Sequence, residues 1–206
     1  MKLFFTRHGE SEANILHEFS NRGFKHPLTE KGKHQARDLV QKLAPIGIDQ
    51  IFSSPLMRAV QTSEIVAEAF QLSLKTTDAL REYDTGVLEG TSDAAGWKID
   101  EGVIHTWVGG KWATRIEGGE SLFDMRLRFV PFIEKLGREH GESSENILLV
   151  SHGGLYRHML PLVLLNIDPD YALNHPIRNT AIIVGEYTSK GLVCVEWCGE
   201  KFEGGS

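Results

Sequence analysis

Short apolar runs alternate with amphipathic segments along the first half of this 206-residue chain. The run at residues 2–6 predicts a short buried strand, and a second strand is predicted at residues 50–54. Apolar residues spaced by three and four positions predict helices over residues 29–43 and from residue 55 to about residue 70. A polar stretch without a clear period separates the first strand from the first helix.

The second half continues this alternation after one long interruption. Residues 84–118 are rich in glycine and tryptophan and have weak periodicity, which predicts an excursion with one or two short helices. A helix follows at 121–136, kinked or broken at Pro131. The continuous apolar run at 146–152 predicts a central buried strand, and the next helix is expected at about 155–165.

Two runs of alternating apolar and polar residues within residues 180–197 predict a terminal antiparallel hairpin. Strands that alternate with helices are typical of an α/β fold, so we expect a three-layer α/β/α sandwich with a mostly parallel central sheet. No repeat or linker divides the chain, and residues 1–206 are expected to form a single domain. The tail at 203–206 is expected to be frayed.

The composition excludes several classes of protein. Lysine and arginine number 22 against 28 acidic residues, so the net charge of −6 gives no general attraction for nucleic acid or an anionic membrane. No stretch is long and apolar enough to cross a membrane or to act as a signal peptide, which favours a soluble cytoplasmic protein. Cys194 and Cys198 lie roughly 13 Å apart on a predicted strand, too far for a disulfide. The hairpin edge could pair with a second copy, which leaves a homodimer open.

Three polar motifs directly follow three of the predicted strands. They are Arg7-His8-Gly9, Ser53-Ser54-Pro55 with Arg58 one turn later, and Ser151-His152-Gly153-Gly154. Ligands of open α/β sheets bind beyond the carboxyl ends of the strands. We therefore expect the three motifs to bring two arginines and two histidines together in one cleft.

The order of these motifs resembles the histidine phosphatase superfamily, in its phosphoglycerate-mutase-like branch. The matching stretches cover residues 7–154 in the order of the family. They are Arg7 to Asn14, Pro27 to Gly32 with Gln35-Ala36, Ser53 to Thr62, Leu80-Arg81-Glu82 with Gly86 and Glu89-Gly90, Gly118 to Ser121, and Ser151 to Gly154. The resemblance implies a phosphate-handling enzyme whose nucleophile is His8, with a backbone carbonyl fixing the tautomer of its ring.

Phosphoryl transfer needs a nucleophile, positive charge around three oxygens, and a proton for the leaving oxygen. Neutral imidazole is a good nucleophile near pH 7, which suits His8. Arg7 and Arg58 suit the second task, because guanidinium groups stay charged and bind phosphate through two parallel hydrogen bonds. His152 would add a third positive or donating group.

The remaining roles come from the resemblance. It places Asn14 on the phosphate, and Gly153 lets the backbone approach the anion closely. Some relatives carry an aspartate after the second histidine, where this chain has Gly153, so the resemblance assigns the acid and base to Glu82. The open alternatives for the acid are Glu10, Asp84 and Glu89.

No metal or other cofactor is expected, because the arginines supply the charge and the nine histidines are scattered without an H-E-x-x-H pair. The predicted function is a metal-independent phosphatase that acts on a small phosphorylated metabolite through a phosphohistidine. A cofactor-dependent phosphoglycerate mutase and a non-catalytic module that binds a phospho-ligand are the alternatives. The Phe24-Lys25-His26 triplet replaces the usual Trp-x-Asp of the mutases, which favours a phosphatase.

The excursion at 84–118 is expected to form a lid or to set substrate specificity, since long loops over active sites often do so. It contains Trp97, Trp107 and Trp112. The alternative is that these tryptophans only pack the excursion against the core.

Overall fold

The computed structural model describes residues 1–202, so the predicted fraying of 203–206 lies outside the described residues. Within this range, seven strands form one mixed sheet in the order β3-β2-β4-β1-β5-β6-β7. The parallel strands are β1 (Lys2–Arg7), β2 (Gln50–Ser53), β3 (Leu74–Thr76) and β4 (Asn146–Ser151). The antiparallel strands are β5 (Ile182–Thr188), β6 (Gly191–Trp197) and β7 (Glu200–Lys201). The predicted parallel core and terminal hairpin are confirmed.

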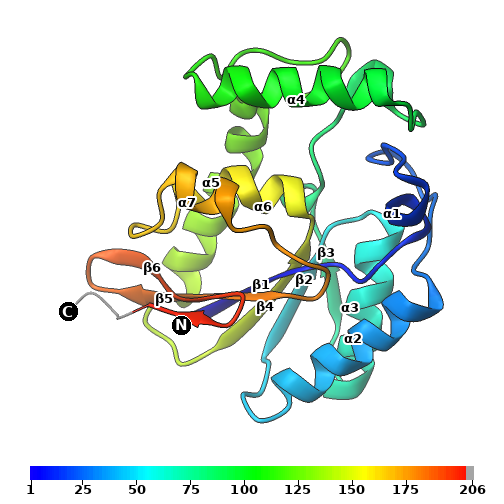
Figure 1. The fold of residues 1–206 in the computed structure, drawn as a ribbon. Coiled ribbons are helices and arrows are strands. Elements are labelled where there is room, and N and C mark those ends of the chain that lie inside the picture. The colour runs from blue at the N-terminus through cyan, green and yellow to red at the C-terminus, as the bar shows by residue number, and fades with distance from the viewer. Residues whose placement is uncertain (203–206) are drawn as a thin grey trace.

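Helices cover both faces of the sheet (Figure 1). The helices α2 (Glu30–Leu43) and α3 (Met57–Phe70) cover one face, and α5 (Leu122–His140), α6 (Gly153–Met159) and α7 (Pro169–Asn174) lie on the other. A further helix, α4 (Ala94–Val108), lies outside this sandwich, above α6 in Figure 1. The three layers agree with the sequence prediction.

Burial on both faces explains why the central strands are continuous apolar runs. Successive side chains of β1 point to opposite faces, so that Leu3 and Phe5 join the core beneath α5 while Phe4 joins the core beneath α2. Every residue from Ile147 to Ser151 of β4 is buried. Because β1 lies between β4 and β5, the end of β1 is held from both sides.

The structure differs from the prediction in several local elements. The helix α1 (Glu12–Leu16) lies in the stretch read as irregular, and β3 and α7 were not predicted. The excursion contains a short 3₁₀ helix at Gly86–Leu88, as expected, and a helix α4 of 15 residues, which is longer than expected. The α5 helix continues through Pro131 to His140, because buried Phe129 and Ile133 anchor it on both sides of the proline.

The helix predicted at 155–165 ends at Met159 and gives way to a 3₁₀ turn at Leu160–Leu162, where Pro161 cannot donate a hydrogen bond. Both cysteines are free, as expected, although Cys198 lies in the turn after β6 and not in the strand. None of the helices in the described part of the chain combines the length and apolarity needed to cross a bilayer.

Candidate active site

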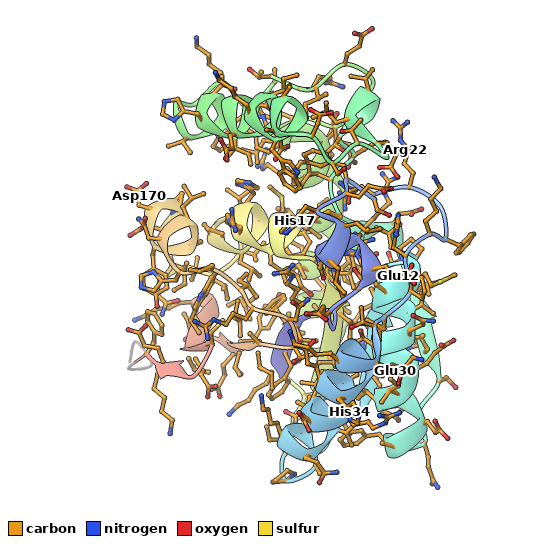
Figure 2. All side chains as sticks on the ribbon, turned by 45° about the vertical axis from the view of Figure 1, so that its right-hand side comes forward. Glu12, His17, Arg22, Glu30, His34 and Asp170 are labelled. Carbon is orange, nitrogen blue, oxygen red and sulfur yellow. The ribbon has the colours of Figure 1, made fainter. Side chains whose placement is uncertain are left out.

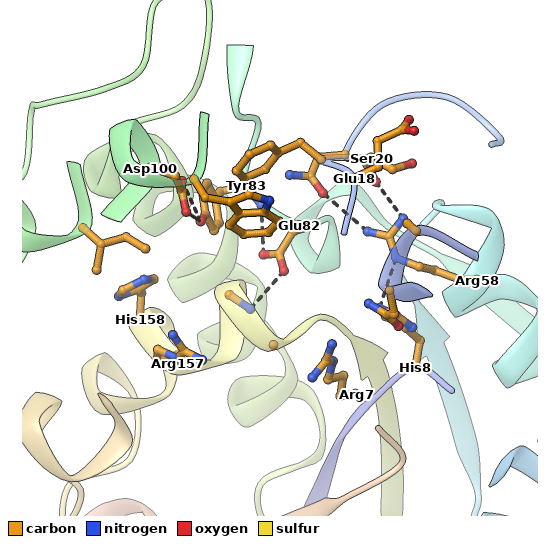
Figure 3. A pocket seen from close by; sticks show the side chains of 18 residues that line it. Arg7, His8, Glu18, Ser20, Arg58, Glu82, Tyr83, Asp100, Arg157 and His158 are labelled. Atoms are coloured by element: carbon orange, nitrogen blue, oxygen red, sulfur yellow. Dashed lines mark hydrogen bonds between the residues drawn. The ribbon is translucent and has the colours of Figure 1, made fainter. Parts of the chain in front are cut away.

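Three loops meet at the carboxyl ends of the parallel strands, where the motifs were expected to converge. Arg7 ends β1 and is paired in register with Ser151 at the end of β4. The backbone N–H of His8 donates to the Ser151 carbonyl at 3.0 Å. The ring centroids of His8 and His152 are 5.1 Å apart. A cavity of about 230 Å³ opens at this junction, and Arg7, His8 and Arg58 line it (Figure 3).

The hydrogen bonds of His8 fix which ring nitrogen carries the proton. Arg58 Nε donates to His8 Nε2 at 3.0 Å. Because a guanidinium group cannot accept a hydrogen bond, Nε2 presents its lone pair and Nδ1 carries the hydrogen. Nδ1 then donates to the backbone carbonyl of Gly9 at 2.6 Å. The ring is thus held in the tautomer whose Nε2 can attack phosphorus.

The surroundings also keep His8 neutral. Its side chain is only 2 % exposed. Burial lowers the pKa of His8 well below 6.5, and the charges of Arg58 and Arg7 lower it further. The hydrogen bond to Gly9 acts in the opposite direction and does not prevent this shift. The imidazole is therefore unprotonated at neutral pH, as a nucleophile must be.

Two guanidinium groups flank the imidazole. Arg58 is 5 % exposed, and its Nη1 donates to the Ser20 carbonyl at 2.7 Å. Burial lowers the pKa of Arg58 to about 10, which still leaves it charged at neutral pH. Arg7 donates from Nη1 to the carbonyl of Ile177 at 3.0 Å, while its Nε is buried and has no partner. Both arginines therefore keep N–H groups available for an anion in the cavity.

His152 was expected to be a positive or a donating group. It is fully buried behind the residues that line the cavity, and its Nε2 lies 2.7 Å from the Ser54 hydroxyl. Burial lowers the pKa of His152 well below 6.5, and the charge of Arg58 adds to this effect. The ring is thus neutral in the ligand-free site, which favours the donating role over the positive one. Its buried Nδ1 has no hydrogen-bond partner in the structure.

The two smaller predicted phosphate contacts also lie at the cavity. Asn14 lines it, and its Oδ1 accepts from the backbone N–H of Ser11 at 3.1 Å. Because Oδ1 is the acceptor in this bond, the amide N–H₂ of Asn14 is left as a potential donor. Gly153 lines the cavity beside Arg7, where a Cβ atom would lie 3.4 Å from the arginine stem.

Asn179 was not predicted, and it holds the backbone at His8. Its Nδ2 donates to the backbone carbonyl of His8 at 2.9 Å and lies 3.4 Å from Asn14 Oδ1. It reaches the site from the segment that precedes β5, 171 residues away from His8 in sequence. The only signal in the sequence is a polar Asn-Thr pair immediately before the apolar run of the hairpin.

Glu82 lies near the middle of the cavity in Figure 3, held by backbone N–H groups. Its Oε1 accepts from Leu155 at 2.6 Å and from Tyr83 at 3.1 Å, and its Oε2 accepts from Gly154 at 2.9 Å. A Cβ atom at Gly154 would lie 2.5 Å from the ring of Tyr83 and 2.8 Å from Glu82 Oε1. A side chain at position 154 would therefore overlap the Glu82 carboxylate, and glycine leaves the space that this carboxylate occupies.

The competing carboxylates lie away from the cavity lining. Glu10 bonds to Lys31 and Thr29, and Asp84 bonds to Arg22. Glu89 accepts from the backbone N–H of Asn21. Among the four candidates from the sequence, Glu82 is the one that lines the cavity. Two carboxylates that were not predicted, Glu18 and Asp100, line it as well.

Comparison with known proteins agrees with this geometry. The family model for the histidine phosphatase superfamily (branch 1) matches residues 3–199. The chain belongs to this superfamily. It is 34 % identical over 199 residues to a 2,3-bisphosphoglycerate-dependent phosphoglycerate mutase of Parvibaculum lavamentivorans, covering 93 % of this chain and 92 % of that protein.

Other members of the superfamily carry phosphatase names. Phosphoserine phosphatase 1 of Hydrogenobacter thermophilus is 32 % identical over 169 residues, which is 82 % of this chain and 78 % of that protein. The fold matches that of a mycobacterial glucosyl-3-phosphoglycerate phosphatase with a TM-score of 0.81 at 22 % identity, covering 97 % of this chain and 99 % of that one. The names share phosphoryl chemistry and differ in the rest of the substrate.

In this member of the superfamily, the wall of the cavity away from His8 comes from α4 and α6. Asp100 is 3 % exposed, and both of its oxygens lie 3.0 Å from the Tyr83 hydroxyl, which donates to them. Arg157 and His158 reach the same wall from α6 (Figure 3). Sequence reasoning missed these residues, because helical periodicity does not show which helix will pack over which loop.

The three tryptophans of the excursion do not share one role. Trp97 lines the cavity and stacks on Phe19 with a distance of 4.1 Å between ring centroids. Trp107 is buried and packs edge-on against Tyr83, while Trp112 packs against the ring of Phe123. Packing therefore accounts for Trp107 and Trp112, whereas Trp97 faces the candidate site.

Residues 1–202 contain no group of three or more histidine, cysteine, aspartate or glutamate side chains arranged to hold a metal ion.

Proposed function

We propose that this protein is a phosphatase that hydrolyses small phosphomonoesters through a phosphohistidine formed on His8. One observation carries this proposal: a buried, neutral imidazole lines a cavity beside Arg7 and Arg58 and is held in the tautomer whose Nε2 carries no proton. A guanidinium pair of this kind suits the three equatorial oxygens of a phosphoryl group in transfer.

The first step forms a bond between Nε2 and phosphorus and breaks the bond between phosphorus and the ester oxygen. Arg58 Nε occupies the Nε2 lone pair in the ligand-free site. A phosphate oxygen is a charged and therefore stronger acceptor, so the guanidinium group is expected to turn to it and release the lone pair. Glu82 in its acid form gives its proton to the departing alcohol, which leaves a neutral product.

The second step hydrolyses the phosphohistidine. Water attacks phosphorus and gives a proton to the Glu82 carboxylate, the bond between Nε2 and phosphorus breaks, and inorganic phosphate leaves with His8 neutral again. The three backbone N–H groups that hold Glu82 keep it in one place for both proton transfers.

A brief reaction with a substrate labelled in its phosphoryl group tests the intermediate. Protein quenched during turnover is expected to carry an acid-labile label on His8, and His8→Asn is expected to lose both the label and turnover. His34→Asn is the matched control, because His34 is exposed on α2 (Figure 2). Turnover at the normal rate in His8→Asn would exclude the proposal.

Metal independence is tested by dialysis against EDTA. The charges of Arg7 and Arg58 stand where a metal would otherwise neutralise the phosphoryl oxygens, so the rate is expected to stay unchanged. A loss of turnover that added Mg²⁺ or Zn²⁺ restores would contradict this part of the proposal.

The mutase alternative keeps the first step and changes the acceptor of the second. It is favoured by the relative named as a phosphoglycerate mutase, which this chain matches over nearly its full length. Transfer of the label to water is expected for a phosphatase, and return of the label to phosphoglycerate is expected for a mutase. Comparing both products in one reaction decides between them.

We also infer that the excursion at 84–118 acts as a specificity element that closes over the substrate. Trp97 and Asp100 on α4 line the cavity and support this inference. Amide exchange in α4 is expected to slow when vanadate, an analogue of the phosphoryl group in transfer, occupies the site. Unchanged exchange would contradict a closing lid.

A further inference from the structure

We propose that Arg157 binds an anionic group on the alcohol portion of the substrate, so that preferred substrates are phosphomonoesters of acidic alcohols. This proposal rests on the phosphatase function proposed above. It concerns the end of the cavity that does not hold the phosphoryl group.

Arg157 differs from the other arginines of the cavity in having no partner. Arg7 and Arg58 each donate a hydrogen bond to a backbone carbonyl. Within the described part of the chain, Arg157 makes neither a hydrogen bond nor an ion pair, although it is half-buried and lines the cavity. A guanidinium group in this position, with its donors free, is suited to a carboxylate or phosphate ligand.

The order of groups across the cavity assigns this ligand to the leaving alcohol. In Figure 3, His8 and Arg58 lie on one side, Glu82 lies near the middle, and Arg157 lies on the other side. The ester oxygen must lie between the phosphorus at His8 and the acid at Glu82. The rest of the alcohol then extends past Glu82 toward Arg157.

The neighbouring carboxylate of Asp100 does not neutralise Arg157 by direct contact. No ion pair within 4.0 Å joins the two, and the Asp100 oxygens accept from Tyr83. Burial dominates both pKa shifts, raising the pKa of Asp100 and lowering that of Arg7, and the charge of Arg157 makes a smaller, downward contribution to each. An alternative role, as a third arginine for the phosphoryl group itself, must therefore be separated by experiment.

Substrate pairs that differ only in the acidic group provide this separation. O-phosphoserine is compared with O-phosphoethanolamine, and 3-phosphoglycerate with glycerol 3-phosphate, because each pair differs by one carboxylate. Glucose 1,6-bisphosphate against glucose 6-phosphate tests a second phosphate as the anion. The wild-type protein is expected to favour the acidic member of at least one pair by kcat/KM, and the favoured pair identifies the anion.

Arg157→Met keeps much of the stem and removes the charge. It is expected to lower this preference by roughly 10- to 100-fold, the effect of a lost charge-assisted hydrogen bond. Arg157→Lys is expected to retain part of the preference, which guards against a merely structural effect. Arg126→Met is the matched control, because Arg126 is exposed on α5 and away from the cavity lining.

Three outcomes would overturn the proposal. They are an equal loss of kcat/KM for both members of each pair in Arg157→Met, an unchanged preference in that variant, and a wild-type protein without preference for acidic substrates. The first outcome would assign Arg157 to the phosphoryl group. Each of them leaves the phosphatase function intact, whereas a lack of turnover with every substrate, including p-nitrophenyl phosphate, would contradict the function itself.

Discussion

The two ends of the cavity are built in different ways. At the phosphate end, His8 and His152 follow directly from paired central strands, and Arg58 lies in the first turn of the helix after β2. At the proposed alcohol end, Asp100 comes from α4, which lies outside the sandwich, and Arg157 comes from the last turn of α6. The sheet thus fixes the groups that we propose act on phosphorus, while α4 and the last turn of α6 carry the groups that we propose meet the variable part of the substrate.

Side-chain contacts, and not strand pairing, hold α4 against the rest of the molecule. Trp97 Nε1 donates to the His17 carbonyl at 3.0 Å, its ring stacks on Phe19, and Asp100 accepts from Tyr83. Such side-chain links can change without disturbing the backbone pairing at the phosphate end. We therefore expect substitutions at the phosphate end to alter kcat, and substitutions at the alcohol end to alter substrate selectivity.

The largest effect is expected at the phosphate end, from Arg58→Met. Loss of this guanidinium group is expected to lower kcat roughly 10²- to 10³-fold for every substrate, because it acts on the phosphoryl group common to all. The charge of Arg58 also lowers the pKa of His8, so the pKa of His8 should rise in the variant.

The sign of this shift can be measured in the pH profile of kcat/KM. Protonated His8 cannot attack, and in the wild-type protein His8 should not limit activity until well below pH 6.5. The acid limb that reports His8 should move to higher pH in Arg58→Met and stay in place in Arg126→Met. A limb at the same pH in all three proteins would contradict the assigned electrostatics.

A smaller effect on kcat is expected from Gly154→Ala, a substitution between the two ends. The added Cβ would lie 2.5 Å from the Tyr83 ring and 2.8 Å from Glu82, so the acid must move. Misplacement of the acid is expected to lower kcat roughly 10²-fold for alkyl phosphates, which need a proton on the leaving oxygen. For p-nitrophenyl phosphate the loss should be much smaller, because p-nitrophenolate leaves without a proton.

Gly102→Ala on α4 serves as the control, since an added Cβ there meets no atom within 4 Å. If Gly154→Ala slowed alkyl and p-nitrophenyl phosphates equally, Glu82 would not be the group that protonates the alcohol.

The smallest effect is expected at the alcohol end, where Asp100 alters the free energy of unfolding. Burial raises the pKa of Asp100 from 3.8 to about 6, so protonation of this carboxyl stabilises the fold. The stabilisation is fully present below pH 3.8 and is lost as the pH rises through about 6. The free energy of unfolding gained by Asp100→Asn should therefore be about 1 kcal/mol larger at pH 8 than at pH 5.

Urea unfolding at the two pH values measures this difference. Asp38→Asn, which changes an exposed residue of α2, should show no such difference. Equal gains for Asp100→Asn at pH 5 and pH 8 would show that Asp100 does not titrate in this range.

The phosphate end was predictable from the sequence for a simple physical reason. His8 and His152 stand immediately after apolar runs that predict buried strands, and Arg58 lies one turn into the helix after a third such run. The carboxyl ends of parallel strands meet at one edge. Adjacency in the chain was therefore enough to predict adjacency in space. The outer strand β3, with its half-buried and exposed residues, lacked such a run and was missed.

The alcohol end could not be predicted in this way. Asp100 belongs to α4, whose placement depends on how residues 84–118 pack, and no local period encodes that packing. Arg157 lies in a helix that was predicted, but the pattern does not show that α4 would complete a cavity beside it. Asn179, which donates to the backbone carbonyl of His8, comes from a distant segment for which the pattern predicted only a hairpin. The neutral state of His152 depends on burial and on the charge of Arg58, which only the assembled site shows.

The central position of β1 has a consequence for the synthesis of the protein. The strand that carries His8 is translated before both of its neighbours, β4 and β5, which begin only at Asn146 and Ile182. Asn179, which holds the His8 carbonyl, is also translated after β4. The apolar strand β1 therefore stays unpaired in the sheet during synthesis until the chain has been extended from Arg7 past Asn146.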